Sequence, residues 1–494
     1  MKVRSVTAFS ILILTLSTVA SVSASSVVPK ARTNASRIDE YISRAMEAGR
    51  IPGLALAILE GHEVTCLKGY GVADRSGRAV TPQTPFFLGS VGKTLTALGI
   101  RQLVNEGRIA YDTTVRECIP WFTLADADAA ARITVRHLIE HKSGLSRAAG
   151  SENYTFQSKY NVEQLVRKLA QVELVRPPGA AREYSNLNFV ILGHIIETVS
   201  GLTYEQYIQK NIFDRLEMKT SFLSRQPAEK AGLAAGHKIV FGITVPLELP
   251  WPTAQVPAGF QISSAEDMAR YVSLFLNNGY FKGESVIPNN ELPERKPPLG
   301  AFAENERGYL AYWQIFRKPD RIGTGHAGGD GLYSTVIRIF PLSMLGIVVL
   351  ANCSDTVSAE SIGEGIAAIL EGKQPAAPDR SLPAHWLLAL VACAIVALLV
   401  FRAGRARRFP GLVSEKGARP LLAWALFWLL DGALPLFILL GIPRVGDMTW
   451  KYHLIANPEI ASIQLASALL LAATGLTKVF LLIRKKQAGQ KASA

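Results

Sequence analysis

The stretch Phe86-Phe87-Leu88-Gly89-Ser90-Val91-Gly92-Lys93 is the part of the sequence from which the rest of the fold can be worked out. It holds the single S-x-x-K pattern of this 494-residue chain. Apolar residues then recur at helical spacing, which predicts a helix over 94–107. Residues three apart at the start of a helix lie on one face. We therefore expect the Ser90 hydroxyl and the Lys93 amine to meet at the N-terminus of this helix.

Two further patterns, each present once, follow along the chain. Tyr184-Ser185-Asn186 matches Y-x-N, and His326-Ala327-Gly328 matches H-x-G. Each is weak alone, because a serine at a helix start is usually a cap and a tyrosine is usually a half-buried core residue. Their joint occurrence in this order predicts one catalytic constellation.

The three patterns supply the groups that a serine nucleophile requires. A hydroxyl is a weak nucleophile and needs a base. Lys93 can act as that base only if burial or a neighbouring cation lowers its pKa, and Tyr184 starts from a pKa of about 10. Both residues stay candidates for the general base. Asn186 is expected to hold Lys93 and the substrate amide.

The H-x-G pattern and the glycine after it are expected to bind the reacting acyl group. Gly328 and Gly329 permit close approach of the backbone. The pattern is expected to precede the strand that flanks the nucleophile. The amide groups of Ser90 and Gly329 are the candidate oxyanion hole, and one such donor is typically worth about 10²–10³ in rate.

Strand-like segments stand at both ends of the region that holds these motifs. Residues 54–59 and 64–70 flank one turn, and 332–340 and 345–353 flank another. The predicted fold is α/β, with one antiparallel sheet built from both ends of the region. Flanking helices cover the sheet, a helical subdomain is inserted in the middle, and the site lies between sheet and subdomain.

Helices are predicted where apolar residues recur with helical periodicity, at 36–49, 94–107, 187–199, 203–215, 265–277 and 357–371. Two of these segments begin with a capping pattern. Ser36 with Asp39, and Ser264 with Asp267, are the expected N-terminal caps.

Both ends of the chain carry segments typical of membrane targeting. Residues 1–24 combine a basic start, an apolar stretch and small residues at Val22-Ser23-Ala24, which predicts a secretory signal peptide; an uncleaved anchor is the alternative. The predicted organisation is a signal peptide at 1–24, a catalytic domain at 25–372, a linker at 373–383 and a membrane domain at 384–494. Three membrane-spanning helices are predicted in the last unit, near 384–401, 420–442 and 461–483.

Charge predicts how these spans are oriented. Residues 402–494 contain 13 Lys and Arg against 4 Asp and Glu, so most of the net charge of +13 lies there. The basic residues cluster between the first two spans and after the third. By the positive-inside rule these segments are cytoplasmic and the catalytic domain faces the periplasm or the outside. Within the spans, Asp431 is expected to serve helix packing or capping, and Lys478 to extend toward the interface.

Composition excludes several other classes of protein. The positive charge is explained by membrane topology, so no nucleic acid partner is predicted. Membrane lipid is a predicted partner. The four cysteines, Cys66, Cys118, Cys353 and Cys393, are spaced too widely for a zinc site. A disulfide among the first three stays open. His137 and His141 are interpreted as structural residues, and neither a metal nor a cofactor is predicted.

The motifs resemble those of the penicillin-recognising serine hydrolases, in particular the class C β-lactamase and D,D-peptidase-like family. Ile133-Thr134-Val135-Arg136-His137-Leu138, Ser143-Gly144-Leu145 and Pro257-Ala258-Gly259-Phe260 are similar to further landmarks of that family. The resemblance covers roughly 35–372. It implies a β-lactamase/transpeptidase-like fold in which Ser90 is acylated, Lys93 is its partner, and Tyr184 and Asn186 form the second motif.

One departure bears on the substrate. His326 stands where β-lactamases carry the lysine of Lys-Thr-Gly, and histidine there is more similar to D-aminopeptidases, D-amino-acid amidases, some D,D-carboxypeptidases and some esterases. With the three spans, the architecture resembles inner-membrane peptidases that remove an acyl-D-amino-acid cap from peptide prodrugs. Those carry an acidic residue where this chain has Phe87, which indicates a more apolar group.

The resemblance therefore implies a peptidase or amidase that cleaves amides next to a D-amino acid in a small peptide or acyl-amide substrate. An esterase, a weak β-lactamase and a penicillin-binding sensor without turnover are the alternatives. The oligomeric state stays open.

Overall fold

The computed structural model describes the chain from Pro29 onward with several gaps. The described residues are 29–149, 160–248, 251–287, 307–310, 313–318, 321–353, 357–378, 382–414, 418–442, 450, 453–454 and 457–492. The predicted signal peptide at 1–24 lies outside them.

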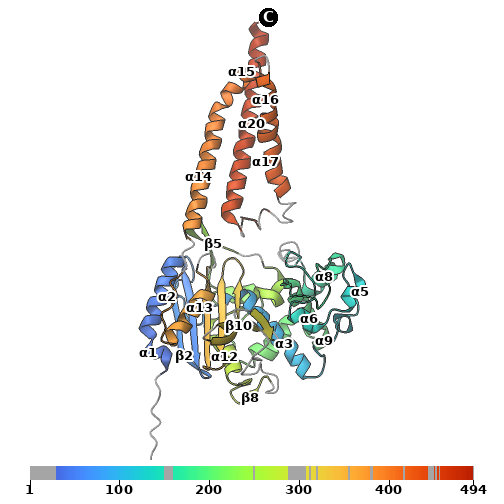
Figure 1. The fold of residues 1–494 in the computed structure, drawn as a ribbon, viewed down its shortest axis with the longest axis vertical. Coiled ribbons are helices and arrows are strands. Elements are labelled where there is room, and N and C mark those ends of the chain that lie inside the picture. The colour runs from blue at the N-terminus through green and yellow to red at the C-terminus, as the bar shows by residue number, and fades with distance from the viewer. Residues whose placement is uncertain are drawn as a thin grey trace, which may run out of the picture.

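A seven-stranded antiparallel sheet forms the centre of the described catalytic domain, in the order β2-β1-β13-β12-β11-β10-β9 (Figure 1). Its strands are β1 (Gly53–Glu60), β2 (Glu63–Gly71), β9 (Arg307–Leu310), β10 (Trp313–Lys318), β11 (Arg321–Gly329), β12 (Ser334–Phe340) and β13 (Leu345–Ala351). Strand β1, near the start of the domain, pairs with strand β13, near the end of the domain, and Leu54 lies opposite Ala351. The prediction of one sheet built from both ends of the region is confirmed.

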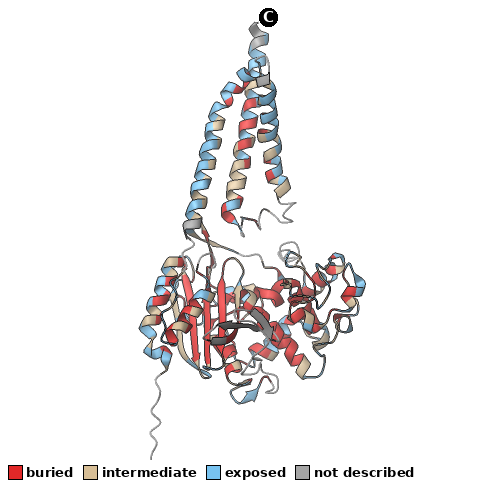
Figure 2. Ribbon diagram, in the orientation of Figure 1, coloured by how far each residue is buried: buried red, intermediate tan, exposed pale blue. Residues whose placement is uncertain are grey.

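Helices cover both faces of this sheet. Strand residues alternate between the faces: Leu54, Leu56 and Ile58 pack in one core with α2 (Ala35–Gly49) and α13 (Ala359–Leu370). Their neighbours Ala55, Ala57 and Leu59 belong to a larger core on the opposite face. Figure 2 shows the central strands coloured as buried. This double coverage explains why β1 reads as a continuous apolar run.

The larger core joins the sheet to a mainly helical region. Its longer helices are α3 (Lys93–Asn105), α9 (Asn186–Ser200) and α12 (Ala265–Leu276). Shorter helices are α4 (Val115–Cys118), α5 (Ala127–Ala131), α6 (Val135–Ile139), α8 (Val162–Lys168), α10 (Tyr204–Ile208) and α11 (Arg225–Lys230), and α1 (Lys30–Thr33) precedes α2. This region supplies two of the three motifs, and the sheet supplies the third.

The structure tests the predicted caps of two helices and the predicted position of the H-x-G pattern. Ser264 caps α12 by accepting a hydrogen bond from the Asp267 amide, as predicted. The predicted cap at Ser36 is wrong, because α1 runs almost directly into α2 and the capping position falls on Asn34. The H-x-G pattern does not precede a strand: it forms the last residues of β11, and that strand itself lies beside the nucleophile turn.

Three long apolar helical segments follow the catalytic domain: His385–Leu412, Pro420–Gly441 and Pro458–Ala488, each long and apolar enough to cross a membrane. They comprise α14 (Leu382–Gly404), η7 (Arg405–Arg408), α15 (Phe409–Leu412), α16 (Ala418–Leu426), η8 (Phe427–Ala433), α17 (Leu434–Leu436), η9 (Phe437–Gly441) and α20 (Pro458–Ala492). Large apolar side chains such as Leu421 and Leu476, each 73% exposed, face outward. The segment Asn186–Phe213 is also apolar, but it bends by 79° between its two helices and its apolar residues belong to the larger core.

A buried ionic cluster joins these three segments. Asp431 of η8 accepts hydrogen bonds from Arg402 of α14 at 2.7 Å and from Lys478 of α20 at 2.6 Å. The predicted packing role of Asp431 agrees with this contact. The expected extension of Lys478 toward the interface is wrong, because Lys478 is buried and its ammonium group is bound to Asp431.

The catalytic domain contacts the base of these helices through a hairpin, β4 (Gly236–Val240) and β5 (Ile243–Leu247), and through Arg50, whose guanidinium carbon lies 5.7 Å from the centre of the Trp386 ring of α14. At the hairpin tip, the Phe241 amide donates to Glu459 of α20, and Glu459 also accepts from His385 of α14 at 3.0 Å. Figure 1 shows β5 directly below α14. The tip of the hairpin and Arg50 thus both contact the helices.

Candidate active site

The predicted nucleophile lies in a tight turn, η1 (Gly89–Gly92), that leads into α3. Gly89 has a φ of +52°, and a Cβ there would lie 2.5 Å from the Gly329 amide nitrogen. Only glycine fits both the left-handed backbone and this close approach. The turn therefore places Ser90 beside the end of β11.

The first two motifs meet around the Ser90 hydroxyl. Ser90 Oγ lies 2.6 Å from the Tyr184 hydroxyl oxygen, and Lys93 Nζ donates to Ser90 Oγ at 3.1 Å. Lys93 also donates to Asn186 Oδ1 at 2.8 Å. Ser90 lies in η1, Lys93 is the first residue of α3, and Asn186 is the first residue of α9. The four side chains form one hydrogen-bonded group, as the sequence predicts.

Lys93 is buried, with 1% of its surface exposed. Besides Ser90 and Asn186 it donates to the Ala258 carbonyl, and among the described residues none of its acceptors is a carboxylate. Burial disfavours the charged ammonium form and lowers the pKa of Lys93 to about 7. A substantial fraction of this lysine is therefore neutral near neutral pH and able to accept a proton.

Tyr184 has the opposite tendency. Burial of its hydroxyl raises the pKa of Tyr184, while the hydrogen bond from Ser90 and the nearby guanidinium groups of Arg147 and Arg182 lower it in part. Both guanidinium carbons lie 5.9 Å from the centre of the tyrosine ring. The protonated phenol is thus favoured, and Tyr184 is arranged to donate or relay a proton.

His141 packs against the ring of Tyr184. The two ring centres are 4.4 Å apart, and His141 Nδ1 lies 3.0 Å from Asn188 Nδ2. Burial and the nearby Lys93 lower the pKa of His141 well below its ordinary value, so the ring is neutral. The sequence predicts His141 only as structural; no local pattern links it to Tyr184, which is 43 positions further along the chain.

The third motif presents a neutral histidine to the site. His326 is 2% exposed, and its Nδ1 donates to the Ala327 carbonyl at 2.7 Å. Burial, aided by the nearby Lys93, lowers the pKa of His326 to about 3. An uncharged imidazole cannot form the ion pair that a lysine at this position would offer to a substrate carboxylate.

The glycines of β11 bring its backbone against the nucleophile turn. A Cβ on Gly328 would lie 2.2 Å from the Leu88 carbonyl oxygen, so a larger residue would separate strand and turn. The same carbonyl accepts a hydrogen bond from the Thr335 hydroxyl at 2.6 Å. The Gly329 amide nitrogen thereby lies beside Gly89 of the nucleophile turn, and the oxyanion hole formed by the Ser90 and Gly329 amides stays a prediction.

The segment Pro257–Phe260 also contacts the site. The sequence alone assigned it no role. It lies in η5 (Val256–Phe260), and its Ala258 carbonyl accepts from Lys93. Next to it, Gln261 donates to the Gly92 carbonyl at 3.1 Å. The composition of this segment gave no signal for these contacts, because they use backbone carbonyls.

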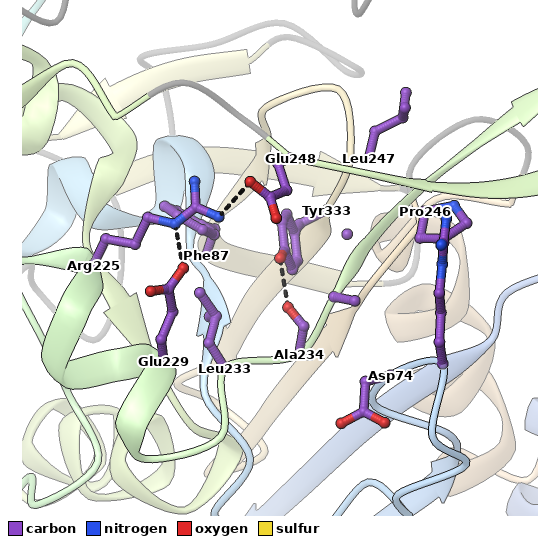
Figure 3. Close-up of a pocket in the computed structure, with 13 residues that line it drawn as sticks. Asp74, Phe87, Arg225, Glu229, Leu233, Ala234, Pro246, Leu247, Glu248 and Tyr333 are labelled. Atoms are coloured by element: carbon purple, nitrogen blue, oxygen red, sulfur yellow. Dashed lines mark hydrogen bonds and ion pairs between the residues drawn. The ribbon is translucent and has the colours of Figure 1, made fainter.

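Phe87 lies in the wall of a neighbouring cavity of about 530 Å³ and not in the Ser90 cluster (Figure 3). Its ring packs against Tyr333, with centres 5.1 Å apart, and against Trp251, at 5.7 Å. Arg225 also lines this cavity, where it pairs with Glu229 at 2.6 Å and with Glu248 at 3.4 Å (Figure 3). The cavity lining thus combines aromatic and ionic side chains.

Two other expectations concern metals and cysteines. Among the described residues, no group of three or more His, Cys, Asp or Glu side chains is arranged to hold a metal ion. All four cysteines are free, so the disulfide that the sequence left open is absent.

Known proteins resemble this chain over the same region. The family model described as Beta-lactamase matches residues 38–371. Protein flp of Staphylococcus aureus strain MW2 is 27% identical over 318 residues, which cover 64% of this chain and 62% of that protein. Unguisins hydrolase ungD' of Aspergillus campestris is 25% identical over 367 residues, covering 69% of this chain and 66% of that protein. The chain thus spans less than two thirds of the length of these relatives.

Solved structures agree on the fold. The octameric penicillin-binding protein homologue from Pyrococcus abyssi has a TM-score of 0.61 and 26% identity, covering 72% of this chain and 81% of that one. FmtA from Staphylococcus aureus has a TM-score of 0.56 and 22% identity, covering 71% and 93%. Because the family model matches most of the chain and the three motifs meet at one serine, the protein belongs to the β-lactamase family of serine hydrolases.

Proposed function

We propose that this protein is a membrane-anchored serine hydrolase that acts outside the cytoplasm through an acyl-enzyme on Ser90. Its substrates are amides next to a D-amino acid, in cell-wall peptides or acyl-peptides. One observation carries the proposal: Ser90 Oγ lies between the Lys93 amine, 3.1 Å away, and the Tyr184 hydroxyl, 2.6 Å away.

Acylation follows from these contacts. Neutral Lys93 accepts the Ser90 proton as Oγ attacks the carbonyl carbon of the substrate. The carbonyl oxygen becomes an oxyanion held by the amides of Ser90 and Gly329. Tyr184 donates its proton to the leaving nitrogen and recovers one from Lys93. The C–N bond breaks, the amine leaves, and the acyl group stays on Ser90 as an ester.

Deacylation uses the same groups in reverse order. A water molecule gives a proton to the neutral Lys93 amine, and the water oxygen attacks the carbonyl carbon of the ester. The Ser90–acyl bond then breaks, Ser90 Oγ regains a proton, and the carboxylic acid leaves. No metal or cofactor takes part in this proposal.

The neutral His326 supports an amide substrate over a β-lactam. A lysine at this position would pair with a carboxylate, whereas burial lowers the pKa of His326 to about 3, so that it is uncharged at neutral pH. A substrate without a carboxylate at this point avoids an unpaired buried charge. The preference for a D-residue rests on the resemblance of the motifs to D-amino-acid peptidases.

An esterase is the second candidate, because the same uncharged His326 equally suits a neutral ester. The test compares purified wild type and Ser90→Ala on acyl-D-aminoacyl amides, their L-enantiomers, a p-nitrophenyl ester and a chromogenic cephalosporin. We expect serine-dependent cleavage that is fastest on the D-amides. Cleavage of the ester or the cephalosporin alone would reject the peptidase proposal, and a stable adduct without turnover would support a sensor.

Membrane anchoring has its own test. The proposal is that the three segments at 385–412, 420–441 and 458–488 cross the cytoplasmic membrane, with the catalytic domain on the periplasmic or extracellular side. Alkaline phosphatase, which is active only outside the cytoplasm, is fused after residue 378, after Lys451 or after Ala494. We expect activity from the first two fusions and not from the third; the reverse pattern would invert the topology.

A further inference from the structure

A second cavity, of about 560 Å³, lies among the three C-terminal helical segments. Ten apolar residues line it: Leu398, Leu399, Phe401, Phe409, Leu412, Ala423, Leu426, Leu430, Leu434 and Leu471. Its remaining lining residues are three cations, Arg402, Arg405 and Lys478, and no carboxylate is among the described residues of this lining. It is far from Ser90 in the chain and shares no residue with the cavity beside Phe87.

The charges around this cavity do not cancel. Asp431 is fully buried and binds both Arg402 and Lys478, so this cluster of three keeps one positive charge. Arg405, one turn beyond Arg402, adds a second positive charge, and its guanidinium carbon lies 4.4 Å from the centre of the Phe401 ring. Arg405 is exposed, whereas the net positive charge of the cluster around the buried Asp431 is costly in an apolar cavity unless an anion accompanies it.

The cationic and apolar parts are arranged along the membrane normal. Arg402 and Arg405 follow the apolar run of α14, at the end that is cytoplasmic in the proposed topology. From there Ala423, Leu426, Leu430 and Leu434 run along one face of the second segment at helical spacing. The cavity thus offers cations at headgroup level and an apolar wall that leads into the membrane.

We propose that this cavity binds a phospholipid with an anionic headgroup. Its phosphate is held by Arg402 and Arg405, and one acyl chain lies along the leucine wall. Basic pockets between membrane helices at the cytoplasmic side have this chemistry. A zwitterionic lipid would leave the net charge uncompensated. The inference rests on the membrane-spanning part of the proposed function and is independent of the reaction at Ser90.

The test is a titration of the delipidated full-length protein in detergent, followed by native mass spectrometry. The probes are phosphatidylglycerol and phosphatidylcholine with identical acyl chains, and oleate. We expect wild type to retain phosphatidylglycerol most strongly. Arg405→Gln should weaken phosphatidylglycerol binding about fivefold and leave phosphatidylcholine unchanged, since it removes one cation at headgroup level.

A matched pair of substitutions tests the acyl-chain wall. Leu430→Trp fills the cavity and should abolish retention of phosphatidylglycerol, whereas Leu421→Trp, on the 73% exposed outer side of the same segment, should leave it unchanged. Equal retention of both phospholipids by wild type would overturn the proposal. So would unchanged binding by Arg405→Gln, equal effects of the two tryptophans, or oleate binding as strong as phosphatidylglycerol.

Ester hydrolysis by each variant in detergent is measured in parallel. We expect wild-type rates, because Arg405, Leu430 and Leu421 lie outside the site at Ser90. A failure of lipid binding with intact hydrolysis would reject the lipid site alone, and a wild type without hydrolysis would reject the proposed reaction alone.

Discussion

Two buried lysines, Lys93 in the candidate active site and Lys478 among the C-terminal helices, differ in their partners. Lys93 donates to a hydroxyl, an amide oxygen and a backbone carbonyl, all neutral. Lys478 binds the Asp431 carboxylate at 2.6 Å, with Arg402 on the same carboxylate. An ammonium group that is buried without an anion loses its proton readily, as the lowered pKa of Lys93 shows. The comparison teaches that the partner, and not burial alone, decides whether a lysine serves chemistry or structure.

Replacing each lysine by methionine separates the two roles and should give the largest difference. Lys93→Met removes the base and should lower kcat at least about 10³-fold, because Ser90 loses its proton acceptor. Lys478→Met is the matched control and should leave kcat near the wild-type value. Steady-state hydrolysis of the preferred D-amide measures both. Comparable losses in the two variants would contradict the division of roles.

Asn186→Asp should give Lys93 a carboxylate partner, as Lys478 has in Asp431. Asn186 Oδ1 accepts from Lys93 at 2.8 Å, so a carboxylate there would form an ion pair and raise the Lys93 pKa from about 7 by roughly 1–3 units. At pH 7 the neutral fraction of Lys93 falls about 5- to 500-fold, and kcat/KM falls with it. The acid limb of the pH profile should move to higher pH by the same amount. An unshifted limb would show that another group controls it.

The sequence predicts a contact well when the residues that form it are close together in the chain, and poorly when they are far apart. Ser90 and Lys93 are three apart and predict their own contact, and the apolar runs of β1 and β13 predict the sheet. Lys478 and Asp431 are 47 positions apart and lie in two different helical segments, so no local pattern revealed their contact. Likewise β11 contains four glycines in nine residues, which weakens any strand signal, although close packing on the nucleophile turn requires Gly328.

His141→Phe tests a smaller effect on the reactive side. The ring of His141 stacks on Tyr184 and its Nδ1 lies 3.0 Å from Asn188 Nδ2, so phenylalanine keeps the stacking but loses the polar contact. We expect kcat to fall about tenfold through misplacement of the Tyr184 hydroxyl, with KM unchanged. His141→Gln, which restores a polar partner, should recover part of kcat. A rise in KM instead would assign His141 to substrate binding.

Asp431→Asn should have the smallest effect on hydrolysis and a large one on the helices. It leaves the buried Arg402 and Lys478 charges without their anion, which costs about 3–5 kcal/mol when one partner of a buried pair is removed. Detergent-solubilised protein should therefore lose its helical signal at lower temperature. Ester hydrolysis below that temperature should match wild type; its loss would show that the helices contribute to the site.

The most direct test of the central claim is the rate at which a fluorophosphonate labels Ser90, followed by intact-protein mass spectrometry on both sides of pH 7. The account predicts one label per chain, absent in Ser90→Ala, with a rate that rises through a midpoint of about 7 as Lys93 loses its proton. In Asn186→Asp this midpoint should lie higher. A label on another residue, or a rate that does not change with pH, would contradict the account.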